Sequence, residues 1–128
     1  MRKRLALLAA LALVVTACGG SSSDTSDTTG NASSSGNAAA GIEAYNGTCV
    51  ACHGPNGEGI EGLGKPWVGS DFINSQTDAE LLAFLIEGRP SDHPDNTTGI
   101  AMMPRGGNPN LTDDDLLNLI AYMRTLNL

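Results

Sequence analysis

The amino-acid sequence predicts an all-α fold for the part of this 128-residue chain that can form a core. Apolar side chains recur at helical spacing in three segments, and each segment has a helix start or stop signal near its ends. No stretch shows the sustained apolar–polar alternation that is typical of a half-buried strand. The length leaves room for one such domain once non-folding segments are set aside.

Sequence signals bound the first two predicted helices. The first covers about 39–52 and ends before Gly54, which a proline follows. The second begins at Thr77, whose hydroxyl can cap the helix while Glu80 completes a Thr-x-x-Glu capping box, and it stops at Gly88. Its apolar side chains are Leu81, Leu82, Phe84, Leu85 and Ile86.

The third predicted helix begins at Thr112, and the three aspartates that follow it lie where the positive end of a helix favours acids. Segments 53–76 and 89–111 between the helices are rich in Gly, Pro, Asn and Asp, and loops of this length usually have a functional reason. Aromatic residues make up only 4% of the chain. A bulky cofactor between the loops would supply apolar volume that the core lacks. The apolar side chains of the third helix are Leu116, Leu119, Ile120 and Met123.

Residues 1–17 have the pattern of a secretory signal, with three cationic residues before an apolar run of 13 residues that is too short to span a bilayer comfortably. The run ends in small residues directly before Cys18, which resembles a bacterial lipobox, where cleavage leaves the cysteine as a lipid-modified N-terminus. The alternative is ordinary cleavage nearby, with Cys18 left free or removed. We expect the lipoprotein form, because a lone exposed thiol is a liability in an oxidising compartment.

Residues 18–37 consist mainly of Gly, Ser, Thr, Asp and Asn, which cannot bury enough surface to offset the entropy of ordering them. We therefore expect a flexible linker that tethers a domain at 38–128 to lipid on the outer face of the plasma membrane or at a periplasmic membrane surface. Removal of the signal leaves four basic residues against 14 acidic ones. Nucleic acid is therefore not an expected partner.

The sharpest signal in the sequence is Cys49-x-x-Cys52-His53. Two thiols three residues apart, at the end of a predicted helix, can form thioether bonds to the two vinyl groups of a haem, and the adjoining imidazole can bind its iron. A thioredoxin-like motif needs a preceding strand, and a zinc site needs two more ligands, of which only His93 is a good one. The motif therefore predicts one covalently attached haem c.

Further residues make the chain similar to the class I c-type cytochromes, especially the small bacterial monohaem domains. Gly41, Tyr45 and Cys49 occur at four-residue steps, similar to the glycine and aromatic ahead of the first haem cysteine in that family. Leu119 and Tyr122 match the leucine and aromatic of its C-terminal helix. The resemblance covers the whole predicted domain and implies the class I cytochrome c fold, in which the N- and C-terminal helices cross closely and bring these two groups into contact.

The resemblance also implies a methionine as distal iron ligand, supplied by the loop before the last helix in a Met-Pro context. Met103 followed by Pro104 matches this, and Pro104 favours an extended backbone at Met103, which helps to aim its side chain. Met103 is therefore the expected distal ligand. Met102, expected to pack at the ring edge, and His93, in a solvated-looking stretch, are the alternatives.

Five residues have weaker predicted roles. In the family a proline carbonyl often orients the haem histidine, and Pro66 is a better candidate for this role than Pro55. Trp67 is expected either to pack on the haem and donate its indole N–H to a propionate or to be an ordinary half-buried residue. Arg89 and Arg105 flank the distal loop, where pairing with propionates is an option, but solvated surface positions are the expectation.

The function predicted from these features is a membrane-tethered one-electron carrier with His/Met-ligated haem c, working in an extracytoplasmic respiratory or photosynthetic chain. No nucleophile–base pair, paired acid site or phosphate loop is present in the sequence, so no independent enzymatic activity is predicted. The alternatives are a haem c subunit of a larger membrane oxidoreductase and an open-site haem sensor or enzyme. The acidic composition predicts redox partners with basic docking surfaces, and we expect a monomer.

Overall fold

The computed structural model describes residues 36–128. The expectations for the signal 1–17, for Cys18 and for nearly all of the linker 18–37 lie outside this range. Within it the all-α prediction is confirmed, since the only β-structure there is two isolated bridges. None of the helices described is long and apolar enough to cross a membrane. The helices are α1 (Ala38–Ala44), α2 (Val50–His53), α3 (Asp71–Ser75), α4 (Asp78–Glu87) and α5 (Asp113–Thr125), with a π-helical turn at Tyr45–Cys49 and a 3₁₀ turn at Pro104–Gly107.

The first predicted helix is a continuous helical segment made of α1, the π-helical turn and α2. Asn37 caps it, because its side-chain oxygen accepts hydrogen bonds from the backbone N–H groups of Ala39 and Ala40. The backbone N–H of Asn37 itself donates to the side-chain oxygen of Asn118 in α5 at 2.7 Å. Asn37, which the sequence assigned to the linker, is therefore part of the folded domain.

The predicted capping box of α4 is present, and α5 begins with a second one that was not predicted. In α4 the Thr77 hydroxyl accepts from the backbone N–H of Glu80, whose carboxylate accepts from the backbone N–H of Thr77 at 2.7 Å. Thr112 and Asp115 make the same reciprocal pair at the start of α5. These hydrogen bonds lower the pKa of both carboxyl groups below their ordinary values.

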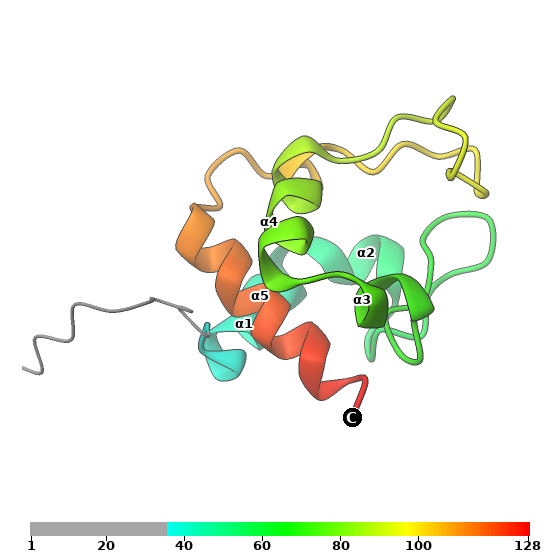
Figure 1. Cartoon of the computed structure of the whole chain (residues 1–128). Helices are drawn as coiled ribbons and strands as arrows, with labels where there is room; N and C mark the ends of the chain where they lie inside the picture. The colour runs from blue at the N-terminus through cyan, green and yellow to red at the C-terminus, as the bar shows by residue number, and fades with distance from the viewer. Residues whose placement is uncertain (1–35) are drawn as a thin grey trace, which may run out of the picture. The chain divides into compact units, whose positions relative to one another are not determined.

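Helices α1 and α5 cross at close range, as the family resemblance implied (Figure 1). Gly41 makes the crossing possible, because a Cβ atom there would collide with the carbonyl oxygen of Asn118 and lie 2.9 Å from the Cβ of Tyr122. The rings of Tyr45 and Tyr122 meet edge to face, with centroids 5.3 Å apart. Tyr45 and Leu119 are both fully buried in the same core.

The short helix α3 was not predicted from the sequence, which placed 53–76 in a loop. Ser70 caps α3 by accepting a hydrogen bond from the backbone N–H of Ile73, and a five-residue helix is too short to show a periodic pattern. Arg124 of α5 ties the connection between α3 and α4 down, since its guanidinium donates to the carbonyl oxygens of Ile73 and Gln76 and pairs with Asp78 at 2.8 Å.

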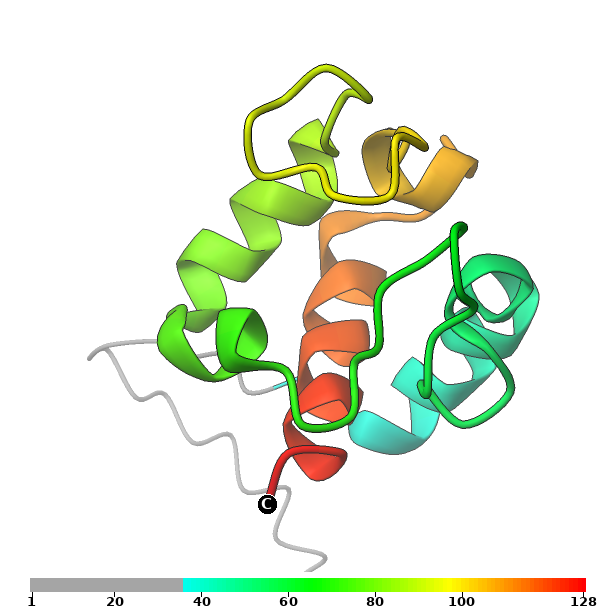
Figure 2. The ribbon, with the colours of Figure 1, turned by 90° about the vertical axis from the view of Figure 1, so that its right-hand side faces the viewer.

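The two long segments that follow α2 and α4 carry almost no regular structure, and they approach each other on one side of the α1–α5 crossing (Figures 1 and 2). The first runs from 54 to 70 and the second from 88 to 103. The helices therefore form a frame, and the two loops lie together beside it.

Candidate functional site

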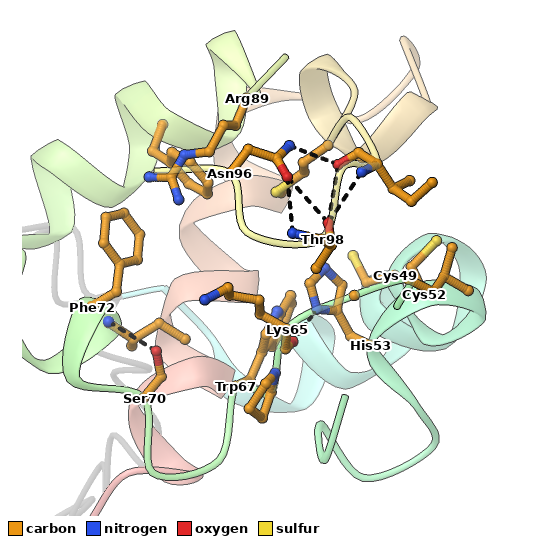
Figure 3. A pocket seen from close by; sticks show the side chains of 18 of the residues that line it. Cys49, Cys52, His53, Lys65, Trp67, Ser70, Phe72, Arg89, Asn96 and Thr98 are labelled. Atoms are coloured by element: carbon orange, nitrogen blue, oxygen red, sulfur yellow. Dashed lines mark hydrogen bonds between the residues drawn. The ribbon is translucent and has the colours of Figure 1, made fainter. Parts of the chain in front are cut away.

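A cavity of about 390 Å³ lies between α2 and the two long loops, and Figure 3 shows it from close by. Its volume falls in the range of small-molecule and cofactor sites. Much of its wall is apolar, and α3, α4 and α5 also contribute to it. The apolar side chains of the wall include Leu63, Trp67, Phe72, Ile73, Leu81, Phe84, Ile100, Met102 and Met123.

Both cysteines of the Cys-x-x-Cys-His motif line this cavity as free thiols. Cys49 ends the π-helical turn and is 8% exposed, whereas Cys52 in α2 is exposed. Burial raises the pKa of the Cys49 thiol to about 12. The end of the first helix therefore presents two sulfur atoms to the same cavity, one buried and one exposed.

His53, the last residue of α2, lies beside these thiols with one ring nitrogen engaged. Its Nδ1 is 2.7 Å from the carbonyl oxygen of Lys65. A carbonyl only accepts, so Nδ1 carries the proton and Nε2 keeps a lone pair free to bind a metal. Burial lowers the pKa of His53, which favours the neutral ring. The expectation of a proline carbonyl is wrong: the acceptor belongs to the residue before Pro66, and the ring of Trp67 packs 5.1 Å from that of His53.

The first loop can hold this geometry because it passes very close to α2. A Cβ atom on Gly64 would collide with the carbonyl oxygen of Cys52. The backbone N–H of Gly59, whose φ is +80°, donates at 2.7 Å to the carbonyl oxygen of His53, one of the carbonyls left unpaired where a helix ends. The loop and the helix end are thereby fastened to each other next to the histidine.

The three candidate distal ligands occupy different positions. Met102 and Met103 both line the cavity, and Met102 is half-buried against the core while Met103 is 57% exposed. His93 is exposed, is not among the cavity-lining residues, and accepts from the backbone N–H of Asp95 at 3.1 Å. The backbone at Met103 is extended, as the following proline predicts.

The second loop is organised by Asn96, which sequence reasoning missed. Its amide nitrogen donates to the carbonyl oxygens of Pro90 and Ile100 at 3.0 and 2.8 Å. Its side-chain oxygen accepts from the backbone N–H groups of Thr98 and Gly99. One side chain thus folds the loop over the cavity, where Asn96 and Thr98 line the wall (Figure 3). The run Asn-Thr-Thr-Gly is the signal for such a turn.

The two arginines that flank this loop differ, although both were expected at solvated surface positions. Arg105 does not line the cavity; it pairs with Asp113 at 2.6 Å and donates to the carbonyl oxygen of Leu111. Arg89 is half-buried and lines the cavity. Trp67 is 4% exposed, so it is a core residue that also faces the cavity.

The fold and the site define a small helical domain built around a Cys-x-x-Cys-His sequence, with both thiols and an oriented imidazole on one cavity. The family model described as Cytochrome c matches residues 38–127, so the chain belongs to the cytochrome c family. The fold is accordingly the all-α class I cytochrome c fold, and the cofactor is covalently bound haem c. Searches of the curated proteins and of the solved structures found no match.

Proposed function

We propose that this protein is a monomeric one-electron carrier whose single haem c is held by thioether bonds to Cys49 and Cys52, with His53 as proximal iron ligand. One observation carries the proposal: two free thiols and an imidazole with an available Nε2 line the same cavity. Membership of the cytochrome c family supports haem-based electron transfer. Bound haem supplies the ferrous–ferric couple, and the protein sets its orientation and potential.

The protein residues act on that couple in two ways. The Lys65 carbonyl fixes the ring orientation and tautomer of His53, which raises the basicity of Nε2. The apolar wall lowers the local dielectric constant, which disfavours the extra charge of oxidised iron.

For the distal ligand we propose a methionine sulfur, and the backbone favours Met102 over the sequence-based choice of Met103. Met102 and Arg89 are paired as an antiparallel bridge, each backbone N–H donating to the other carbonyl at 2.8 and 2.7 Å. Residues paired in this way project to the same face, and the next residue along an extended chain projects to the other. Met102 therefore shares the cavity face of Arg89; Met103 also borders the cavity, but it is 57% exposed, whereas Met102 is half-buried.

Two leucine variants test the whole proposal on the purified exported protein. A pyridine haemochrome spectrum of the wild type establishes thioether attachment. Met102→Leu should abolish the ferric charge-transfer band of a methionine–iron bond and lower the midpoint potential markedly, because the soft thioether favours ferrous iron. Met103→Leu is the matched control and should change neither. The opposite result assigns the ligand to Met103, and a wild type without the band rejects methionine ligation.

We further propose that the carrier is a lipoprotein tethered through Cys18 in an extracytoplasmic respiratory or photosynthetic chain. The signal-like segment and the cysteine after small residues support this, as does the generally extracytoplasmic place of cytochromes c. Cys18→Ser should move the haem protein from the membrane fraction to the soluble fraction with its spectrum unchanged. A variant that stays with the membranes contradicts the lipid anchor.

The partners we propose are redox proteins with basic docking surfaces. The described residues contain twelve acidic and four basic side chains, so this part of the chain is acidic overall. Attraction between opposite charges speeds encounter and is screened by salt. Electron-transfer rates with a basic partner should therefore fall as ionic strength rises, and rates that stay constant contradict this docking mode.

A further inference from the structure

The four basic side chains in residues 36–128 fall into two pairs. Arg105 and Arg124 lie outside the cavity, and each contacts a carboxylate, at 2.6 and 2.8 Å. Lys65 and Arg89 both line the cavity, and neither has a carboxylate within 4.0 Å in this part of the chain, although acidic residues outnumber basic ones there three to one. Two of the four basic side chains in this acidic domain, Lys65 and Arg89, therefore lie at the cavity without a carboxylate partner.

Arg89 is held firmly where it is. Its backbone is paired with Met102, and its guanidinium carbon lies 5.0 and 4.8 Å from the ring centroids of Phe72 and Phe84. Its N–H groups remain free, since no acceptor within residues 36–128 is hydrogen-bonded to them. A half-buried cation whose donors have no protein acceptor is suited to an anionic ligand.

The chemistry of haem says where anions would lie. The porphyrin carries its two vinyl groups on one side and its two propionates on the opposite edge. In Figure 3, Cys49 and Cys52 lie on one side of His53, and the cationic ends of Lys65 and Arg89 reach to the other side, toward Phe72. Attachment of the vinyl groups at the cysteines would therefore place the propionates on the side where the two cations lie.

We propose that Arg89 and Lys65 bind the haem propionates, Arg89 through its free guanidinium N–H groups and Lys65 through its ammonium group. The inference rests on the haem attachment proposed above. It also gives Lys65 two connected tasks, because its backbone carbonyl orients the proximal histidine while its side chain holds the far edge of the ring. The other titratable side chains on the cavity are Cys49, Cys52, His53 and Asp95, so Asp95 is the one carboxylate there that competes for the two cations.

A cation that neutralises a propionate disfavours the additional positive charge of ferric haem, so it raises the midpoint potential. Arg89→Gln and Lys65→Gln in the holoprotein should each shift the midpoint potential downward, with the larger shift for the more buried Arg89. Each should also shift the propionate bending band in the resonance Raman spectrum. Arg89→Lys keeps the charge and should restore most of the potential.

The control is Asn110→Asp, which makes the same change in net charge at an exposed position that does not line the cavity, and which should leave both readouts unchanged. If Arg89 only packs on the two phenylalanines, Arg89→Gln will lower stability without moving the Raman band, and this overturns its role. Lys65→Gln, at an exposed side chain, keeps the test available should Arg89→Gln not fold, and an unmoved band there removes Lys65. A wild type without a thioether haemochrome rejects the proposed function itself, whereas a normal haemochrome with unmoved bands rejects only this inference.

Discussion

The α1–α5 crossing and the wall of the cavity are built from different kinds of contact. At the crossing, Gly41 and Tyr45 are buried against the protein itself. On the wall, apolar side chains line a cavity instead: Phe72, Ile100 and Met103 are 37, 46 and 57% exposed. At the crossing, the protein's own atoms fill the contact, whereas the cavity wall encloses the space for the haem. Changes in the two regions should therefore affect different properties.

The largest effect is expected at the cavity wall, from the loss of both cysteine thiols. Cys49→Ser with Cys52→Ser should abolish covalent haem and leave a protein with much less helix, because the wall then has no group to pack against. Pyridine haemochrome and circular dichroism measure the two losses. Ala51→Ser, an exposed change inside the same motif, should retain haem and fold. If the haem of the double variant stays attached to the polypeptide in acidified organic solvent, attachment at this motif is refuted.

A smaller effect, confined to stability, is expected at the crossing. Gly41→Ala places a Cβ against the Asn118 carbonyl and should lower the free energy of unfolding by about 1–3 kcal/mol. Gly47→Ala is the matched control, because no atom lies within 4 Å of its Cβ position, and it should be neutral or stabilising by up to about 1 kcal/mol. Denaturant unfolding of the holoproteins measures both, with the haem spectrum unchanged. Equal effects at the two glycines would show that the close approach does not limit the crossing.

The same division explains what could be predicted from the sequence. Helix caps and the Cys-x-x-Cys-His motif are local patterns, so the starts of α4 and α5 and the thiols beside His53 were predicted correctly in position. The crossing followed from the family resemblance, which identified Gly41 and Tyr45 by their spacing. These features depend on residues a few positions apart in the chain.

The wall was harder to predict because its geometry depends on pairing between distant residues. The acceptor for His53 is the Lys65 carbonyl rather than that of the next residue, and only the path of the first loop past α2 determines this. Met102 and Met103 both line the cavity, and the directions in which their side chains project depend on the pairing of Met102 with Arg89, which lies in the segment leaving α4. A shift of one residue in the path of either loop would put the adjacent residue, Pro66 or Met103, in the place of Lys65 or Met102. The amino-acid composition of a loop does not determine this register.

A third prediction concerns the frame alone and is smaller again. Thr112→Ala removes the hydroxyl that caps α5 and should cost about 1 kcal/mol of stability. Thr125→Ala, at the other end of the same helix, removes a hydroxyl that donates to the carbonyl oxygen of Tyr122, three residues earlier in the helix. This change should lower the stability by less than Thr112→Ala does. Denaturation midpoints compare the two. Similar losses at both ends would mean that the cap contributes no more than any surface threonine.

The smallest expected effect is the pH dependence of the same cap. Hydrogen bonds from Thr112 lower the pKa of Asp115 in the folded state, so the folded protein binds the proton less readily than the unfolded chain. The stability from this group is therefore complete above the ordinary carboxyl pKa of 3.8 and is lost as the pH falls through the lower folded value. Asp115→Asn keeps an acceptor oxygen but no charge, so the gap in stability between it and the wild type should be widest near neutral pH and should close in acid. Unfolding of both proteins from pH 7 downward measures the gap, and a gap that stays constant would show that the Asp115 charge is not coupled to folding.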